Sequence, residues 1–507
     1  RTLPPGRDRV RRRCSELAVG WVLTFGRHTV TRALAALGRT EQDWTAWHRL
    51  FSRARFDPDA AGRALVTETR PFVPAADPYV AAVDTTILSR HSRRLPGGSW
   101  WRAAGAAPFA RGLRRGQRLL SLHWLALRAA SGYGWAVPLR RPPAFPASAQ
   151  PSGEPPRREW EAARDATSWL RAALDAAGQA EQPLVIVGDG ACDTADLYRT
   201  APERTVLLTR AARNRTRYAL PTPAAPHTRG ARRRSGEHMP TPAELLRVPR
   251  GWTRVTLMIR GRRRRVRARL IAPVLVKPAS GCPLFLVVAH GAGRRAAPRR
   301  RQPWFGLVTA VPDGNVGWQP PADLGTLLGW AWQRWEEEFA HREEKTTLGM
   351  DQPPASSAAG TVLTPQWVAW LYAVLALAGL RVWGQDPPPH AATTRWWRGS
   401  QRWTLGQVLQ GLRAELGNQG GISARLGGHR GHSARIGARR DAAGQCDACR
   451  RPHLTLAGAC AAGLPPPRTR HRRSSGRSTA PLAAPKKPKS RQETGRPKRP
   501  PPLQFPG

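Results

Sequence analysis

The sequence WAWQRWEEEFAHREEKTTLG, from Trp330 to Gly349, decides which fold we expect for this chain. It contains no proline, and Gly349 stands where a helix would end, so the pattern predicts one helix. At 3.6 residues per turn, one face of that helix collects one carboxylate and three cations: Glu338, Arg334, Arg342 and Lys345. Such a face is common on solvated helices with ion pairs, and it also suits chemistry on a phosphate backbone.

The composition indicates a polyanionic partner. Among 507 residues, 82 are Lys or Arg and 34 are Asp or Glu, which gives a formal net charge of +48. Nucleic acid is the expected partner for such a charge, and a membrane surface is the rival. The most apolar stretch, Trp367 to Leu380, is too short to span a bilayer and is interpreted as a buried helix. The six scattered cysteines favour a reducing compartment over a disulfide scaffold.

Two further acids belong to apolar segments. The stretch from Tyr79 to Leu88, YVAAVDTTIL, predicts a buried strand that contains Asp84. A second short strand, Val185 to Val187, is followed at once by Asp189 in a glycine-flanked turn. A buried carboxylate needs a partner, and a metal ion is one answer. The alternative for Asp84 is a cap of the turn after its strand, and the alternative for Asp189 is an ordinary strand-to-helix turn with Asp193 or Thr194 as the N-cap.

The flanking regions divide the chain further. Residues 1–70 read as short helices, with Thr29 as a cap and Gly38 as a stop, and either bind DNA or support the next domain. The segment Ser89–Gln117 reads as a Gly- and Arg-rich loop that suits a nucleic-acid contact. Within about 220–320, alternating residues on both sides of Arg262–Arg265 predict a basic β-hairpin in a β-rich insertion.

The end of the chain has a different composition. Residues 416–507 form a low-complexity, basic segment that we expect to be disordered. A loose zinc-knuckle spacing occurs within it at Cys446, Cys449, His453 and Cys460. A frameshifted or decayed C-terminus explains the same segment equally well, so zinc binding stays open.

The spacing in the quoted helix resembles a signature of bacterial insertion-sequence transposases, Tyr-x2-Arg-x3-Glu-x6-Lys. Arg334, Glu338 and Lys345 match its Arg, Glu and Lys positions, whereas Ala331 replaces the Tyr. The Gly-flanked Asp189 resembles the second catalytic Asp of the same DDE transposases. The resemblance covers most of residues 15–415.

The resemblance implies an α/β fold in which helices flank a ribonuclease H-like mixed sheet. The expected organisation is an N-terminal helical, DNA-binding domain at 1–70, then a catalytic domain at 71–415 with a β-rich insertion at about 220–320. In the family, three carboxylates hold the metal ions, which here would be Asp84, Asp189 and Glu338.

The resemblance also implies the chemistry and the partners. Two Mg²⁺ or Mn²⁺ ions on those carboxylates would support cleavage of transposon ends and strand transfer into target DNA. Arg334, Arg342 and Lys345 would contact DNA phosphates. We expect a homodimer on double-stranded DNA, in the bacterial cytoplasm at the nucleoid, with no role for a membrane.

Two other functions remain open from the sequence. One is a transposase-derived DNA-binding protein that has lost catalysis, which Ala331 and the unusual C-terminal segment make credible. The other is a protein that coats RNA or DNA through charge alone, without preference for terminal repeats.

Overall fold

The computed structural model describes residues 8–89, 95–102, 112–128, 132–149, 157–222, 233–291, 303–315, 317–354, 357–384 and 402–418. The possible zinc ligands Cys446, Cys449, His453 and Cys460 lie outside the described residues, as does the predicted disordered segment beyond residue 418.

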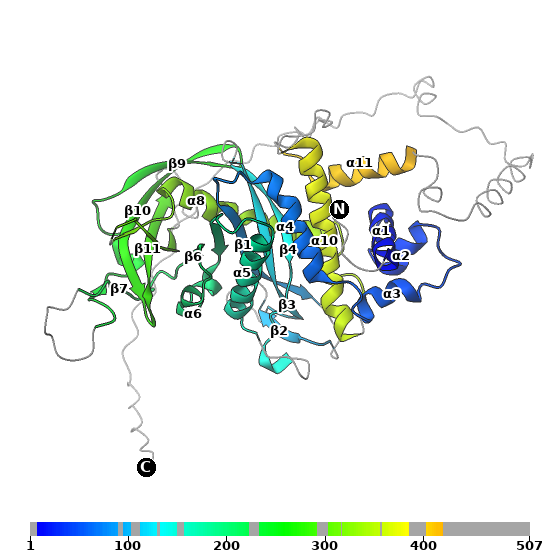
Figure 1. Ribbon diagram of the computed structural model, residues 1–507, viewed down its shortest axis with the longest axis horizontal. Helices are drawn as coiled ribbons and strands as arrows, with labels where there is room; N and C mark the ends of the chain where they lie inside the picture. Colours follow the sequence, from blue (N-terminus) through cyan, green and yellow to red (C-terminus); the bar gives the residue numbers. More distant parts are fainter. Residues whose placement is uncertain are drawn as a thin grey trace, which may run out of the picture. The chain divides into compact units, whose positions relative to one another are not determined.

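The described chain begins with helices and continues into a large sheet (Figure 1). The N-terminal helices are α1 (Asp8–Leu23), α2 (Val30–Ala36), α3 (Thr45–Ser52) and α4 (Pro58–Thr69). The next elements are β1 (Tyr79–Ser89), β2 (Gly98–Arg102), β3 (Leu113–Arg128), β4 (Tyr133–Arg140), α5 (Glu159–Ala176), β5 (Leu184–Gly188), α6 (Ala195–Arg199) and β6 (Thr205–Arg210).

The inserted region and the C-terminal helices follow. The inserted elements are β7 (Arg217–Ala219), β8 (His238–Met239), α7 (Pro242–Leu245), β9 (Thr253–Ile259), β10 (Arg262–Val276), β11 (Ala279–Gly291), β12 (Trp304–Thr309), β13 (Val311–Pro312) and β14 (Trp318–Gln319). The final helices are α8 (Leu324–Gln333), α9 (Trp335–Thr346), α10 (Ala358–Trp383) and α11 (Leu405–Asn418).

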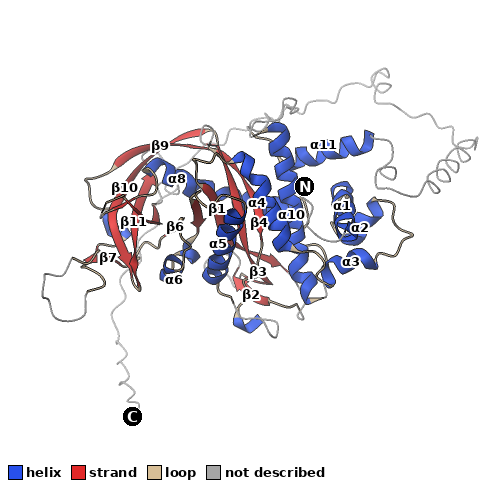
Figure 2. Ribbon diagram, viewed as in Figure 1, coloured by secondary structure: helices blue, strands red, loops and turns tan. Residues whose placement is uncertain are grey.

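Strand β1 joins the antiparallel and the parallel parts of the mixed sheet (Figure 2). It pairs antiparallel with β3 and parallel with β5, while β4 continues the antiparallel side and β6 the parallel side. The order β4-β3-β1-β5-β6 is therefore that of a ribonuclease H-like sheet, as the sequence predicted. The inserted strands extend the same sheet, because β12 pairs antiparallel with β6 and is followed by β11 and β10.

Helices α5 and α9 cover opposite faces of this sheet. Successive side chains of a strand point to opposite faces, so Asp84 and Thr86 share one face while Thr85 lies on the other. Asp84 and Thr86 contact Arg334 and Lys345 at α9, whereas the Thr85 hydroxyl lies 3.3 Å from Glu159 of α5. The two faces of β1 are thus covered by different helices.

Two sequence predictions need correction. The segment Ser89–Gln117 is not a loop throughout, because β2 pairs there with the first residues of β3 and places Trp100 opposite Arg115. The single helix expected from Trp330 to Gly349 is divided into α8 and α9 at Arg334. The N–H of Glu337 bonds to the Arg334 carbonyl three residues back, at 3.0 Å, so the chain makes one tighter turn there.

The N-terminal helices share the hydrophobic core of the sheet domain. As predicted, Thr29 caps α2 and Gly38 follows it at a positive φ of 68°. Helix α10 packs between these helices and β4, and 83% of its most apolar window is buried inside the protein. Its length and composition alone would fit a membrane span, but its burial is that of a core helix.

Replacement of Trp21 tests whether the N-terminal helices and the sheet unfold together. Its indole N–H donates to the Leu348 carbonyl at 2.9 Å, and its ring contacts Trp367 edge-on at 4.9 Å. Because Trp21→Phe leaves a buried carbonyl unpaired, it should lower the free energy of unfolding by about 1–3 kcal/mol in a single transition. Urea unfolding measures this; Trp100→Phe, at a 62% exposed position, is the control. Equal stability of both variants would contradict the coupling.

Candidate active site

The register of the sheet brings Asp84 and Asp189 together. Val83 of β1 pairs with Gly188 of β5, so Asp84 and Asp189 are the next residues on two adjacent parallel strands. Adjacent strands lie about 4.8 Å apart, which puts the two acids within reach of one ion. Asp189 also caps the short 3₁₀ turn after β5, since its Oδ1 accepts from the Ala191 N–H at 2.9 Å. Asp189 therefore both caps this turn and lies next to Asp84.

Asp84 is a largely buried carboxyl group, with a side chain that is 19% exposed. Burial raises its pKa to about 7; the carboxylates of Glu337 and Asp189 add to the rise, and the Arg334 guanidinium opposes it. Arg334 Nη1 lies 2.8 Å from Asp84 Oδ2, and the Thr85 N–H donates to Oδ1. Asp84 therefore sits where carboxylate charges accumulate and a cation is needed.

Three consecutive glutamates lie in the first turn of α9, and each has different neighbours and a different exposure. Glu336 is buried and paired with two arginines, Arg402 at 2.8 Å and Arg260 at 3.4 Å. Glu338 has a side chain that is 39% exposed and lies 3.6 Å from Arg334 Nη2. Burial raises the pKa of Glu338, Arg334 lowers it and Asp84 raises it. Glu338 therefore faces Asp84 from the partly exposed side of the helix.

Glu337 is the fully buried member of this group. Its Oε1 lies 2.8 Å from His123 Nδ1, and its Oε2 has no hydrogen-bond partner among the described residues. Burial raises the pKa of Glu337 well above its usual range; Arg334 and Arg141 lower it, and Asp189 raises it. Glu337 and Asp189 both raise the pKa of Asp84, and Asp189 raises the pKa of Glu337, so Glu337 is a third acid close enough to interact with both aspartates.

The sequence prediction of Glu338 as the third acid stays a prediction, and the tighter turn at Arg334 leaves its contact with Arg334 in place. Regular helical spacing places residues four apart on one face, which pairs Arg334 with Glu338. The structure keeps this pairing, with Arg334 Nη2 3.6 Å from Glu338 Oε1, and the tighter turn adds the hydrogen bond from the Glu337 N–H to the Arg334 carbonyl. The buried residues of α9 are Glu336, Glu337, Ala340, His341 and Glu344.

The three predicted phosphate-binding cations lie in different environments. Arg334 contacts Asp84 and Glu338; burial alone lowers its pKa, but Asp84, Glu337 and Asp189 outweigh that effect and raise it. The Lys345 ammonium donates to the Thr86 hydroxyl at 2.6 Å and to the Ile87 carbonyl at 3.2 Å. Arg342 is exposed, with its guanidinium 4.9 Å from the Phe339 ring centroid. Arg334 and Lys345 therefore flank the face of β1 that carries Asp84.

The residues at this centre fit a divalent cation. Hard oxygen donors suit Mg²⁺ and Mn²⁺, and three carboxyl groups in a largely buried site repel one another unless a cation compensates them. The unpaired Glu337 Oε2 is a buried acceptor of the kind that a metal ligand provides.

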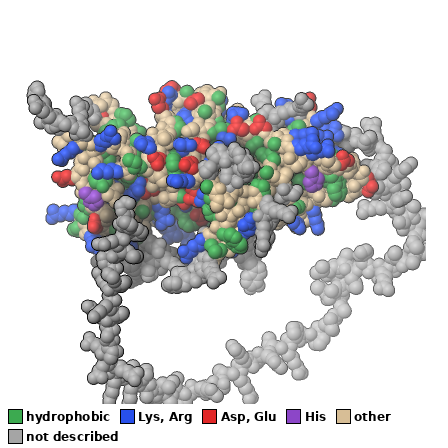
Figure 3. All heavy atoms as spheres, turned by 90° about the horizontal axis from the view of Figure 1, so that it is seen from below, with side chains coloured by type: hydrophobic (Ala, Val, Ile, Leu, Met, Phe, Trp, Pro, Cys, Tyr) green, Lys and Arg blue, Asp and Glu red, His purple; other side chains and the backbone are tan. Residues whose placement is uncertain are grey.

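A basic surface lies on the inserted hairpin of β9 and β10. Because paired residues of antiparallel strands point to the same side, the register Arg265–Thr256 and Arg267–Arg254 places four exposed arginines on one face: Arg254, Arg263, Arg265 and Arg267. The opposite face buries Val266 and Ala268. Figure 3 shows further basic side chains spread over the visible face of the molecule. The predicted basic β-hairpin is thus present and presents a cationic ladder.

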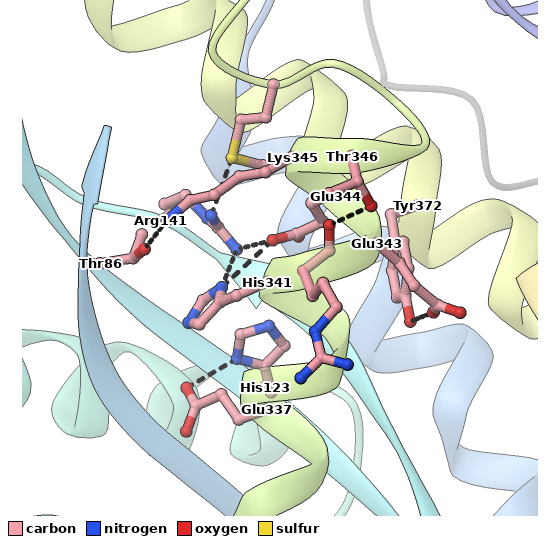
Figure 4. Close-up of polar contacts among 12 residues, drawn as sticks. Thr86, His123, Arg141, Glu337, His341, Glu343, Glu344, Lys345, Thr346 and Tyr372 are labelled. Carbon is pink, nitrogen blue, oxygen red and sulfur yellow. Dashed lines mark hydrogen bonds and ion pairs between the residues drawn. The ribbon is translucent and has the colours of Figure 1, made fainter. Parts of the chain in front are cut away.

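Sequence reasoning missed the buried residues behind Glu337. His123 from β3, Arg141 after β4, and His341 and Glu344 of α9 gather there (Figure 4). One signal was available, since His123 interrupts the otherwise apolar run LLSLHWLAL. Nothing local indicated that this histidine faces Glu337, because the two residues are 214 positions apart.

The raised pKa of Asp84 predicts how pH affects the metal-free protein. An unfolded Asp carboxyl has a pKa of about 4, so between about pH 4 and 7 the native state holds one more proton than the unfolded state. The free energy of unfolding should therefore fall as the pH rises through this window, by up to about 1.4 kcal/mol per pH unit. Asp84→Asn should reduce that fall in urea unfolding with EDTA at pH 5 and 8.

The control for this measurement is Glu181→Gln, at a side chain that is 91% exposed. It should keep the pH dependence of the wild type. An unchanged pH dependence in Asp84→Asn would show that Asp84 does not hold the extra proton.

The chain was compared with protein families and with curated proteins, and one family matches the part that carries Asp84 and Asp189. A search of curated proteins returns no match to the chain. The family described as DDE superfamily endonuclease matches residues 6–271, more than half of the chain, including Asp84 and Asp189 but not α9. Endonucleases of this superfamily use divalent metal ions and act on DNA. The expected kinship with DDE-type transposases is confirmed, while the Tyr-Arg-Glu-Lys subgroup stays a prediction. The protein belongs to the DDE superfamily endonucleases.

Proposed function

We propose that this protein cuts DNA strands at transposon ends and transfers them into target DNA, with Mg²⁺ or Mn²⁺ as its cofactor. The observation that carries the proposal is the parallel pairing of β1 with β5, which sets Asp84 and Asp189 side by side, next to Arg334 and the glutamates of α9. Membership of an endonuclease family supports the nuclease part. The strand-transfer part rests on the resemblance to insertion-sequence transposases.

The third carboxylate of this proposal is Glu337, with Glu338 as the alternative. Glu337 is fully buried, has one oxygen anchored by His123 and has the other unpaired among the described residues. Glu338 is more exposed and interacts with Asp84 and Arg334 only at the rim. A carboxylate that is held at one oxygen loses little freedom when the other oxygen binds an ion, so Glu337 is better prepared to act as a ligand.

The chain's own groups have distinct tasks in this mechanism. Two bound ions would activate the attacking oxygen and stabilise the leaving oxygen of an in-line displacement. Asp84, Asp189 and Glu337 hold their oxygens in a water-poor site. Arg334 balances the carboxylate charge and, with Lys345 and the exposed Arg342, offers cations to the scissile phosphate and its neighbours.

Double-stranded DNA is the proposed substrate, and the arginine ladder of β9 and β10 is a proposed contact for its backbone. By resemblance, two copies would act together on the two transposon ends. The cytoplasmic location at the bacterial nucleoid follows from that substrate, and the burial of α10 supports a chain that works without a membrane.

Substitution of the glutamates tests which one serves the chemistry. Glu337→Gln should reduce single-turnover cleavage more than about 100-fold, because residues that only support metal ligands already cost about 10- to 100-fold. Glu338→Gln should reduce it less than about 10-fold. The substrate is a duplex that carries the inverted repeat flanking the gene, incubated with Mg²⁺ or Mn²⁺.

Ala variants of Asp84 and Asp189 complete this experiment and should abolish cleavage while DNA binding persists. Full activity in either variant would sink the assignment of these aspartates. The reverse order of the two glutamate variants would restore Glu338 as the third ligand. Repeat-specific binding without cleavage by the wild type, even in Mn²⁺, would establish the inactive DNA-binding protein instead.

Removal of the arginine ladder tests the DNA contact separately. Arg263→Ala with Arg265→Ala and Arg267→Ala should weaken binding at all sequences and reduce the slope of log affinity against log salt by about 3, since about one unit is lost per phosphate contact. Filter binding at several salt concentrations measures the slope. The matched control replaces three exposed arginines outside the hairpin and the N-terminal helices, Arg158, Arg199 and Arg204. An unchanged slope in the ladder variant would contradict the contact.

A further inference from the structure

A buried polar cluster lies between α9 and strands β3 and β4 (Figure 4). Its members are His123, Arg141, Glu337, His341 and Glu344, and each of them is at most 8% exposed. Buried polar atoms are normally paired, so unpaired ones need an explanation. In this cluster, Nε2 of both histidines and Oε1 of Glu344 have no hydrogen-bond partner among the described residues. Two imidazole nitrogens and one carboxylate oxygen are thus buried without a described partner.

The three side chains that carry these atoms converge. One ligand atom each from His123, His341 and Glu344 lies within 4.8 Å of the others. His123 comes from β3, whereas His341 and Glu344 are three positions apart and therefore neighbours on the surface of α9. Two histidines and one glutamate are a ligand set that zinc takes in proteins, with water at the fourth tetrahedral position. The cluster therefore has the composition of a zinc site.

The hydrogen bonds on the other nitrogens suit this role. His123 Nδ1 lies 2.8 Å from Glu337 Oε1, and His341 Nδ1 lies 3.2 Å from Glu344 Oε2. A histidine that binds a metal ion through Nε2 carries its proton on Nδ1 and commonly donates that proton to a carboxylate. Both histidines therefore have a carboxylate acceptor at Nδ1, and this arrangement leaves Nε2 of each ring for an ion.

Arg141 is the feature of the cluster that opposes a cation. Its Nη2 lies 2.6 Å from Glu344 Oε2 and 3.3 Å from His341 Nδ1. The shorter contact occupies one oxygen of Glu344 and leaves Oε1 unpaired. His341 Nδ1 can accept from Arg141 or donate to Glu344, and an ion on Nε2 selects the second. The positive charge of Arg141 weakens cation binding, and the second carboxylate, Glu337, offsets that effect.

We propose that His123, His341 and Glu344 bind a zinc ion that is separate from the catalytic cation and ties α9 to β3. The imidazole ligands favour Zn²⁺ over Mg²⁺, which prefers oxygen ligands. The burial of all three ligands suits a structural ion, because no substrate reaches it. This inference goes beyond the proposed function, and it does not depend on which glutamate serves the two aspartates.

The test measures bound metal in the full chain with Cys446→Ala and Cys449→Ala, called the reference chain, because those cysteines could bind zinc themselves. His123→Ala and His341→Ala are added to it one at a time. His238→Ala, at an exposed histidine of β8, is the matched control. The protein is purified without chelator from zinc-supplemented medium, and its metals are identified and counted by mass spectrometry.

The reference chain and His238→Ala should each hold about one zinc ion per chain. His123→Ala and His341→Ala should each bind zinc more than about 100-fold more weakly, because residues that only support a metal ligand already contribute about 10- to 100-fold. EDTA should lower the thermal midpoint of the reference chain and leave that of both ligand variants unchanged, since only a bound ion stabilises the folded state.

Zinc absorption spectroscopy on the reference chain keeps the proposal testable if the ligand variants do not fold. It should show nitrogen and oxygen ligands at about 2.0–2.2 Å and no sulfur at about 2.3 Å. A folded reference chain without zinc, zinc retained in both ligand variants, sulfur ligands, or iron in place of zinc would each overturn the inference.

No readout of this test involves DNA. An inactive protein that still holds zinc through His123 and His341 would refute the endonuclease proposal and leave the zinc site standing. An active endonuclease without zinc would do the reverse.

Discussion

The repulsion among buried carboxylates is the constraint on which this structure depends. Asp84, Asp189 and Glu337 come from a strand, the turn after a neighbouring strand and a helix far along the chain, and the last two raise the pKa of Asp84. Folding them together is costly, and the protein compensates part of that cost with Arg334. Carboxyl groups placed close together at this free-energy cost are typical of ligand-binding sites, and a divalent cation is the ligand that matches their oxygens and charge.

Strand pairing and helix packing place the acids and the residues around them. The parallel pairing of β1 and β5 aligns the two aspartates, and the antiparallel pairing of β1 and β3 brings His123 to the face that α9 covers. The core helix α10 packs on β4, and its Tyr372 hydroxyl donates to Glu343 of α9 at 2.8 Å. Trp21 of α1 donates to the Leu348 carbonyl in the turn after α9 at 2.9 Å. The inserted strands lengthen the same sheet, so the basic hairpin and the two aspartates belong to one hydrogen-bonded sheet.

Much of this could be predicted from the sequence, and the remainder depended on tertiary contacts. The apolar runs around Asp84 and before Asp189 identified both strands and both acids, because buried strands have a strong local signature. The break of the helix at Arg334 had no such signature. Arg334 keeps right-handed helical backbone angles, so the break needs neither proline nor glycine, the residues that mark a helix end in a sequence. The structure buries Glu336 and Glu337 and leaves Glu338 partly exposed, which the sequence pattern did not indicate. The pairing of His123 with Glu337 depends on strand and helix packing over a long chain separation, which no local pattern records.

The most direct test of this account is a crystal of the full chain soaked in Mn²⁺, with the ions located by anomalous scattering. The account predicts an ion about 2.0–2.2 Å from oxygens of Asp84, Asp189 and Glu337, with His123 still bound to the second oxygen of the glutamate. An ion held by Glu338, or no ion near the aspartates, would contradict it.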